Sequence, residues 1–385
     1  MKIFLIPTLL FFLIFSVNAQ DKQPPIMGWS SWNHFKLNIN EDVIKAQADA
    51  MVESGLYDAG YRFINIDDGY FGGRDAQGNL LIDTTKFPSG MRNLVDYIHQ
   101  KELKAGIYTD AGKNTCGYYS RDKDKNGYGV GIYGHIPEDV DLFFNQWNFD
   151  FLKVDWCGAE AMRLDEETEY LNIYNAIKKI DKSINYNICR WAFPGKWAID
   201  KADSWRISYD IFPKFSRILY IIEKNANLYP YASSGHYNDM DMLEVGNGMT
   251  YDEDKSHFSM WCMMNSPLMT GNNLKNMSKQ TLEILTNKEL IALNQDEGFK
   301  QAKRIIKQKK VDVWVKPLGK NSDQFAIAIF NKSNKAVDYT LKTENIGISR
   351  DKVVRDLWLH QDLGKIGAKK SFTIPAHGIV VLKTN

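Results

Sequence analysis

The chain has 385 residues, more than a typical single domain, which predicts a large barrel followed by a smaller module. Its formal net charge is +1, so composition offers no electrostatic case for binding nucleic acid or an acidic membrane surface. Aromatic residues make up 13% of the chain. Most of them belong in a core, but Trp and Tyr in loops also stack on the C–H-rich faces of sugars.

Residues 1–19 have the pattern of a cleavable export signal, with a basic start at Lys2, an apolar run, and small residues ending at Ala19. The run is short for a membrane span and no basic cluster follows it. We therefore expect a periplasmic or extracellular protein with no membrane span in the mature chain. Four cysteines are too few for a disulfide scaffold, although one pair is plausible. They are Cys116, Cys157, Cys189 and Cys262.

Short apolar strands that end in polar residues alternate with amphipathic helices through residues 20–296. The predicted strands cover 26–29, 63–68, 104–109, 151–157, 185–189, 204–208, 236–243 and 267–269. The predicted helices cover 41–51, 88–101, 137–147, 166–180, 194–202, 212–225, 256–264 and 278–294. Eight strand-then-helix units predict a parallel (β/α)₈ TIM barrel, with the seventh and eighth strands the least clearly marked.

The pattern changes from about Phe299 onward, where short alternating strands are separated by turns. These strands cover 311–315, 324–330, 337–341, 353–358, 371–374 and 379–382. They predict that residues 297–385 form a C-terminal antiparallel β-sandwich of about eight strands.

Within the fourth predicted strand, Lys153 and Asp155 lie two residues apart and therefore point to the same face. Two charged groups at the end of an apolar run are costly unless they pair or bind something. They are either a buried ion pair with a structural role or a carboxylate nucleophile that the lysine keeps ionised.

The carboxyl ends of the strands form the active-site face of such a barrel. The polar and aromatic residues predicted there are Trp32, Asp67, Asp68, Tyr108, Asp110, Lys153, Asp155, Arg190, Arg206, Asp210, Asp239, Asp241 and Met242. Asp110 and Asp239 taken singly are better explained as caps. Neither a DxDxDG calcium loop nor a His pair at ligand spacing occurs, so we expect no metal and no cofactor.

Two carboxylates in an aromatic-lined pocket are the minimum machinery for glycoside hydrolysis. Asp155 would attack the anomeric carbon, with its pKa lowered by Lys153 and Arg206. Asp210 would protonate the leaving oxygen, with its pKa raised by the charge of Asp155 and by desolvation.

Six motifs in order make the chain resemble glycoside hydrolase family 27, a melibiase-like family of retaining α-galactosidases and α-N-acetylgalactosaminidases. They are Met27-Gly28-Trp29-Ser30-Ser31-Trp32, Ile66-Asp67-Asp68-Gly69, Tyr108-Thr109-Asp110-Ala111-Gly112 with Thr115-Cys116, Lys153-Val154-Asp155-Trp156-Cys157, Arg206-Ile207-Ser208-Tyr209-Asp210, and Asn238-Asp239-Met240-Asp241-Met242-Leu243. The resemblance runs from Pro25 to about Asp296, and the family also has a C-terminal β-domain.

The resemblance implies a nucleophile at Asp155, an acid/base at Asp210 and a Cys116–Cys157 disulfide. It also implies a set of residues that bind the sugar. In that set Asp67 and Asp68 bind O4 and O6, Lys153 and Arg206 bind ring hydroxyls, Trp32 walls the apolar face, and Tyr108, Asp241 and Met242 complete the pocket.

The chain departs from the family at the fifth strand, where Cys-Glu-Trp is usual and Cys189-Arg190-Trp191 stands instead. Arginine can donate a hydrogen bond to the sugar's O2 but cannot accept one. Arg190 therefore either contacts the substrate or points away and pairs with a carboxylate. The segment also looks too bulky for an N-acetyl group.

These patterns predict an exported retaining exo-glycosidase that acts on oligosaccharides or polysaccharides with terminal α-galactose. The alternatives within the family are α-N-acetylgalactosaminidase and β-L-arabinopyranosidase, and the intact Asp67-Asp68 pair favours a hexose. A non-catalytic carbohydrate-binding protein is a further alternative, but it predicts loss of Asp155 or Asp210, and both are present.

Overall fold

The computed structural model describes residues 23–121, 123–320 and 322–385. The predicted export signal lies outside these residues. Among the residues that are described, no helix combines the length and apolar character needed to cross a membrane.

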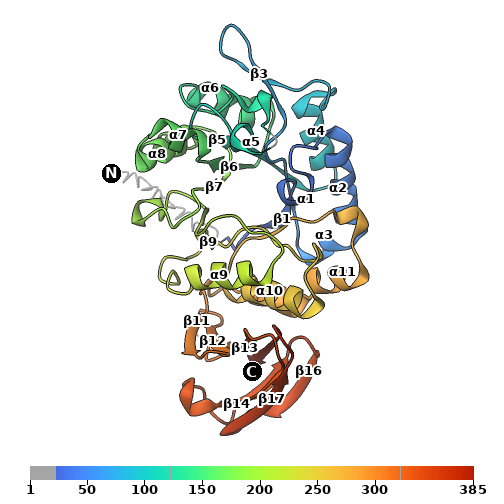
Figure 1. Ribbon diagram of the computed structural model, residues 1–385, viewed down its shortest axis with the longest axis vertical. Helices are drawn as coiled ribbons and strands as arrows, with labels where there is room; N and C mark the ends of the chain where they lie inside the picture. The colour runs from blue at the N-terminus through green and yellow to red at the C-terminus, as the bar shows by residue number, and fades with distance from the viewer. Residues whose placement is uncertain (1–22, 122, 321) are drawn as a thin grey trace, which may run out of the picture.

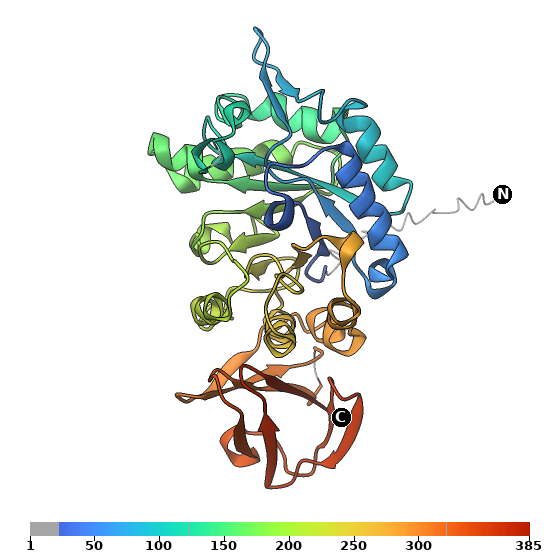
Figure 2. The ribbon, with the colours of Figure 1, turned by 45° about the vertical axis from the view of Figure 1, so that its right-hand side comes forward.

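Eight strands form one parallel sheet in the order β10-β1-β2-β5-β6-β7-β8-β9. A parallel bridge between Leu243, just after β9, and Thr270 of β10 joins the two edges of the sheet. The strands are β1 (Met27–Ser30), β2 (Phe63–Asn65), β5 (Lys104–Asp110), β6 (Phe151–Asp155), β7 (Asn185–Ile188), β8 (Ser204–Arg206), β9 (Tyr237–Asp239) and β10 (Leu268–Thr270). The predicted (β/α)₈ barrel is confirmed, and Figures 1 and 2 show its helices around the sheet.

The main helices cover the outside of the barrel. They are α2 (Glu41–Glu53), α4 (Gly90–His99), α6 (Ile136–Asp141), α8 (Glu166–Ile177), α9 (Phe215–Asn225), α10 (Tyr251–Met263), α11 (Lys279–Leu285) and α12 (Lys288–Asn294). Short helices α1 (Trp32–Phe35), α3 (Leu56–Ala59), α5 (Cys116–Tyr119) and α7 (Cys157–Met162) occupy the loops. Side chains cap the N-termini of several main helices. The Asn40 side chain accepts a hydrogen bond from the Val43 N–H at the start of α2, and Thr250 forms a capping box with Glu253 at the start of α10.

Three local predictions were wrong or incomplete. Residues 194–202 hold only the 3₁₀ turn η3 (Lys196–Ala198), because Gly195 and Asp200 have left-handed φ angles of 114° and 66° that interrupt a helix. The helix predicted for 137–147 ends at Asp141 and continues as the π-turn η2 (Leu142–Gln146). An unpredicted hairpin, β3 (Phe71–Arg74) with β4 (Leu80–Ile82), projects at the top of Figure 1.

The C-terminal part is an antiparallel structure with its own apolar core, as predicted. A six-stranded sheet, β11-β12-β13-β18-β15-β16, is accompanied by the pair β14-β17. The strands are β11 (Lys303–Lys307), β12 (Val311–Pro317), β13 (Phe325–Asn331), β14 (Val337–Lys342), β15 (Val353–Asp356), β16 (Gln361–Lys365), β17 (Lys369–Ile374) and β18 (Ile379–Thr384). β11 and β16 were not predicted.

This β-domain packs on the outer helices of the barrel (Figure 2). Trp358 Nε1 donates to Ser259 Oγ at 2.9 Å, Ser256 Oγ donates to the His377 carbonyl at 2.6 Å, and the Phe215 and Phe330 rings meet edge to face. The β-domain therefore packs against α9 and α10 on the outside of the barrel.

Candidate active site

An open cavity of about 870 Å³, including open space at its mouth, lies at the carboxyl ends of the barrel strands. All the sequence-predicted catalytic and sugar-binding residues except Arg190 line it: Trp32, Asp67, Asp68, Tyr108, Lys153, Asp155, Arg206, Asp210, Asp241 and Met242. Residues from both halves of the barrel meet here because parallel strands all end at the same rim. No described residue of the β-domain lines this cavity.

Asp155 ends β6 and is buried, with Oδ1 accepting from the Trp156 N–H at 3.1 Å. Lys153 lies on the same face of β6, but its direct partner is a different carboxylate. Lys153 Nζ donates to Asp67 Oδ2 at 2.8 Å, across 86 residues of sequence. The lysine therefore acts on Asp155 through its charge while it holds Asp67 in place.

Asp210 follows β8 and keeps 67% of its side chain exposed. The buried Arg206 binds two carboxylates with one nitrogen: Nη2 lies 3.0 Å from Asp210 Oδ1 and 2.7 Å from Asp241 Oδ2. Asp241 Oδ2 also accepts from the Ile211 N–H at 2.7 Å. This network orients the loop that carries Asp210.

The pKa values of the two carboxyls are shifted in the opposite directions to those expected. Burial raises the pKa of Asp155 to about 6, and the charge of Asp210 adds to the rise against the lowering effect of Lys153. Desolvation also acts to raise the pKa of Asp210, but Arg206 and Lys153 outweigh it and leave that pKa below its ordinary value. The sequence showed the charges but not the depth of Asp155 or the direct contact of Asp210 with Arg206.

A pH profile follows from these shifts. If Asp155 is the nucleophile and Asp210 the acid, as predicted, the active form has Asp155 ionised and Asp210 protonated, so the pair carries one proton. Two interacting carboxyls lose their last proton at the higher pKa, here about 6. We expect kcat/KM to fall about tenfold per pH unit above that value, and to fall at low pH only when a second proton binds below the lowered pKa.

The variant Asp210→Asn provides the control for this profile. With a glycosyl fluoride as substrate, whose leaving group needs no proton, the fall above pH 6 should disappear in this variant. A basic limb that persists in Asp210→Asn would mean that another group, such as Asp68, titrates instead.

Asp67 and Asp68 follow β2 and are both buried. Asp67 N–H donates to Ser31 Oγ at 2.9 Å, and Asp68 Oδ2 accepts from the Gly117 N–H at 2.7 Å. Burial raises the pKa of Asp68 to about 7 despite that hydrogen bond. The pair offers carboxylate oxygens on one wall of the cavity, where they can accept hydrogen bonds from sugar hydroxyls.

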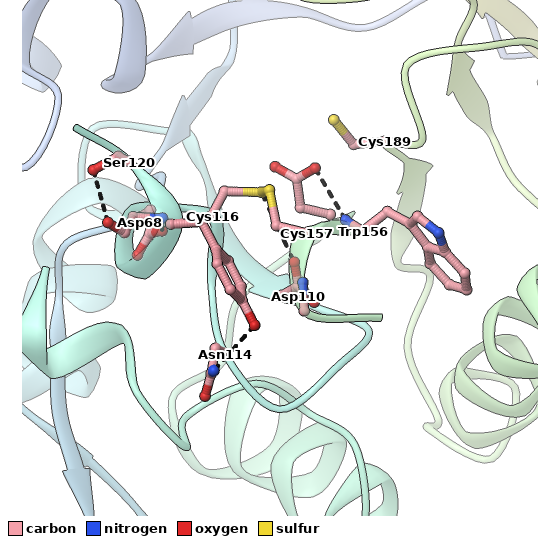
Figure 3. Close-up of a disulfide and its surroundings, with 12 residues drawn as sticks. Asp68, Asp110, Asn114, Cys116, Ser120, Trp156, Cys157 and Cys189 are labelled. Atoms are coloured by element: carbon pink, nitrogen blue, oxygen red, sulfur yellow. Dashed lines mark hydrogen bonds between the residues drawn. A yellow bond between two sulfur atoms is a disulfide. The ribbon is translucent and has the colours of Figure 1, made fainter. Parts of the chain in front are cut away.

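A disulfide joins Cys116 and Cys157, with a Cα–Cα separation of 5.1 Å, and it lines the cavity. It ties the loop after β5 to α7 after β6 (Figure 3). Beneath it, Asp110 Oδ1 accepts from the Gly112 and Gly158 N–H groups at 2.7 and 3.0 Å, a capping role that the sequence allowed. The remaining cysteines, Cys189 and Cys262, are free and buried.

Among the described residues, one group has its candidate metal-ligand atoms close enough together to share an ion, namely Asp110, Cys116 and Cys157. The sulfurs of Cys116 and Cys157 form a disulfide, so neither is a thiolate that could bind a metal. The other predicted cap, Asp239, accepts from Asn187 Nδ2 at 2.8 Å and from the Asp241 N–H at 2.8 Å beneath the cavity.

Arg190 is ion-paired with Glu166 of α8 and does not line the cavity. Its neighbour Trp191 does line it and has a left-handed φ of 61°. Sequence reasoning placed Cys189-Arg190-Trp191 at the end of the fifth strand but assigned a role in the site to Arg190 and none to Trp191. It also missed five lining residues that lie in the loops: Asn33, Lys36, Tyr119, Ser120 and Ile211.

Carboxylates from β6 and from the loop after β8 share one aromatic-walled cavity, as cleavage of a glycosidic bond requires. Together with the barrel, this places the protein in the class of glycoside hydrolases. The family model described as Alpha galactosidase A matches residues 24–296, and that of the Alpha galactosidase C-terminal beta sandwich domain matches 308–384. The chain therefore belongs to glycoside hydrolase family 27.

Individual relatives agree with the family. The chain is 40% identical to Alpha-galactosidase A of Cellvibrio japonicus over 388 residues, covering 94% of this chain and 92% of that one. Alpha-galactosidase I of Mortierella vinacea matches with a TM-score of 0.87 and 32% identity, covering 95% and 98% of the two chains. An alpha-galactosidase of Saccharomyces cerevisiae, solved with raffinose, matches with a TM-score of 0.82 and 26% identity, covering 94% and 97%.

Proposed function

We propose that this protein is an exported retaining exo-glycosidase that hydrolyses terminal, non-reducing α-D-galactosyl residues through a covalent glycosyl-enzyme intermediate. The α-galactosidase assignment rests on the family and on relatives that cover nearly the whole chain. The observation that carries the mechanism is that Asp155 and Asp210 line the same cavity as the Asp67-Asp68 pair.

In the first step a carboxylate oxygen of Asp155 attacks the anomeric carbon while Asp210 gives its proton to the leaving oxygen. The glycosidic bond breaks, and galactose remains bound as an ester to Asp155. In the second step Asp210 takes a proton from water, the water oxygen attacks the anomeric carbon, and Asp155 leaves as a carboxylate. Two inversions restore the α-configuration, and the two carboxyls should lie about 5–5.5 Å apart when substrate is bound.

The bound sugar must change the protonation of Asp210, because Arg206 favours its charged form in the free site. A galactose ring that covers the exposed face of Asp210 removes water from it and raises its pKa. The attack by Asp155 also removes one of the two negative charges. Both effects favour the proton on Asp210 at the moment when the leaving oxygen needs it.

Sugar recognition is assigned to the cavity walls. Asp67 and Asp68 accept from O4 and O6, which selects galactose by its axial O4. Lys153, held by Asp67, and Arg206 donate to ring hydroxyls. Trp32 covers an apolar face of the ring, and Tyr108, Asp241 and Met242 complete the pocket.

Discrimination at the sugar's 2-position is assigned to Trp191, because its side chain rather than that of Arg190 lines the cavity. In Trp191→Ala, we expect the kcat/KM ratio of α-N-acetylgalactosaminide to α-galactoside to rise about tenfold or more, the scale for changing one pocket wall. The adjacent Arg190→Lys is the matched control and should leave the ratio unchanged. An unchanged ratio in Trp191→Ala would contradict the assignment.

The proposed function is tested on wild-type protein with nitrophenyl α-galactoside, α-N-acetylgalactosaminide and β-L-arabinopyranoside side by side. We expect the galactoside to have the highest kcat/KM. Proton NMR at early times should show α-galactose as the first product. Release of β-galactose would exclude retention, and preference for the pentoside would exclude the assignment of Asp67 and Asp68 to a hexose.

Export is supported by the Cys116–Cys157 disulfide, since such bonds persist in oxidising compartments. We propose a periplasmic or extracellular location and a substrate that is an oligosaccharide or polysaccharide bearing terminal α-galactose. The raffinose-bound yeast relative supports a substrate of this kind.

A further inference from the structure

The strongly exposed Tyr and Phe side chains of the described residues are confined to two loops. The aromatic residues with strongly exposed side chains are Tyr119, Tyr128, Tyr209 and Phe212, and each lies in the loop after β5 or the loop after β8. Burying aromatic rings is favourable, so exposed rings that gather in two loops next to a cavity are candidates for contact with a ligand. Two of the four, Tyr119 and Tyr209, flank the cavity that holds Asp155 and Asp210.

Tyr119 ends α5 and lines the cavity while remaining 46% exposed. Its hydroxyl oxygen accepts from Asn114 Nδ2 at 3.1 Å, and its ring meets the Tyr118 ring edge to face at 5.1 Å. These two contacts hold the ring in place at the mouth. The neighbouring Ser120 also lines the cavity and can hydrogen-bond a ligand hydroxyl.

Tyr209 directly precedes Asp210 and is 62% exposed. Its ring is stacked on Trp191, with centroids 6.4 Å apart and planes inclined by 19°. Trp191 forms part of the cavity wall, so Tyr209 extends that wall outward toward solvent. In strand order the β5 and β8 loops lie on either side of β6 and β7, so the two tyrosines flank Asp155.

The group that leaves galactose must pass through this mouth, because Asp210 protonates its oxygen beside Tyr209. A sugar has apolar C–H faces that stack on aromatic rings and hydroxyls that bond to groups such as Ser120. We infer that Tyr119 and Tyr209 form a binding site for the sugar to which galactose is attached, and that these two rings determine specificity for the leaving group. This inference rests on the proposed function.

The test compares two substrates that share galactose and differ in the leaving group. α-Galactosyl fluoride releases fluoride, which is too small to touch the tyrosines, whereas α-galactosyl-(1→6)-glucose releases a sugar. In Tyr119→Ala and in Tyr209→Ala, we expect kcat/KM on the disaccharide to fall about fivefold to tenfold, the effect of one aromatic contact. The rate on the fluoride should stay within about twofold of wild type.

Tyr128→Ala is the matched control, because Tyr128 lies in the same loop as Tyr119 and is 66% exposed but does not line the cavity. It should leave both rates unchanged. An equal fall on both substrates in the tyrosine variants would mean a structural role, and no fall on either would mean no contact; both results overturn the inference. A wild-type enzyme that cleaves neither substrate would instead overturn the proposed function.

Discussion

Replacing Asp155 with asparagine is expected to reduce kcat by roughly ten-thousandfold or more, the scale seen when the nucleophile of a catalytic unit is removed. Asparagine keeps the size of the side chain but cannot form the ester with galactose. Initial rates on nitrophenyl α-galactoside measure the loss. Residual activity above about one per cent would show that Asp155 is not the nucleophile.

The loss in Asp155→Asn should not come from unfolding. Burial raises the pKa of Asp155 to about 6, so ionisation of this group destabilises the fold as pH rises from its unfolded pKa through about 6. An uncharged asparagine removes that effect, and the melting temperature at neutral pH should be equal or higher. The exposed Asp200, with 76% of its side chain in solvent, provides the control Asp200→Asn, which should keep wild-type activity.

The role of Asp155 can be identified from the anomer that forms when azide restores activity to a variant. In Asp155→Ala, the shortened side chain leaves space for azide on the face from which the carboxylate attacks. A single displacement there should yield β-galactosyl azide, which proton NMR distinguishes from the α-anomer by its coupling constant. An α-azide from this variant would assign Asp155 to the acid/base role instead.

Replacing Asp210 with alanine is expected to slow cleavage of α-galactosyl oligosaccharides by about 10²- to 10⁴-fold, the contribution of a positioned general acid. With α-galactosyl fluoride the first step should be nearly unaffected, because fluoride leaves without a proton. The second step still lacks its base, so the glycosyl-enzyme should accumulate and appear as an initial burst of fluoride.

Azide should then react with the accumulated intermediate of Asp210→Ala. Azide needs no base, and it attacks from the face that water would use, so the product should be α-galactosyl azide. The two alanine variants are thus matched controls for each other, since they predict opposite anomers. A first step that is slowed equally for the fluoride, measured in the burst phase, and for the oligosaccharide would contradict the acid/base role of Asp210.

Much of this site could be predicted from sequence because its parts are local. Buried strands that end in polar residues predicted the barrel, and parallel strands bring their carboxyl ends to a single rim. Residues at these ends or just beyond them, such as Asp67, Asp155 and Asp210, therefore had to come close in space. The β-domain after residue 299 could also be predicted from local sequence. The alternation of apolar and polar residues in a strand has a period of two, which is visible within one short segment.

Only the tertiary structure decided which charged groups meet. Lys153 pairs with Asp67, which lies 86 residues away, and Arg190 pairs with Glu166 of α8 rather than facing the cavity. Sequence spacing determines the face of a strand on which a side chain lies, but the contacts also depend on how neighbouring loops turn. The left-handed backbone at Trp191 is such a turn, and its indole lines the wall.

The pKa values depended on tertiary structure in the same way. The sequence by itself determined the barrel, the β-domain and which carboxylates share the rim, because strand patterns and strand ends are properties of short segments. The depth of Asp155 and the contact between Asp210 and Arg206 were decided by packing. Burial and charge at close range dominate a carboxyl's pKa, and both depend on atoms that are distant in sequence.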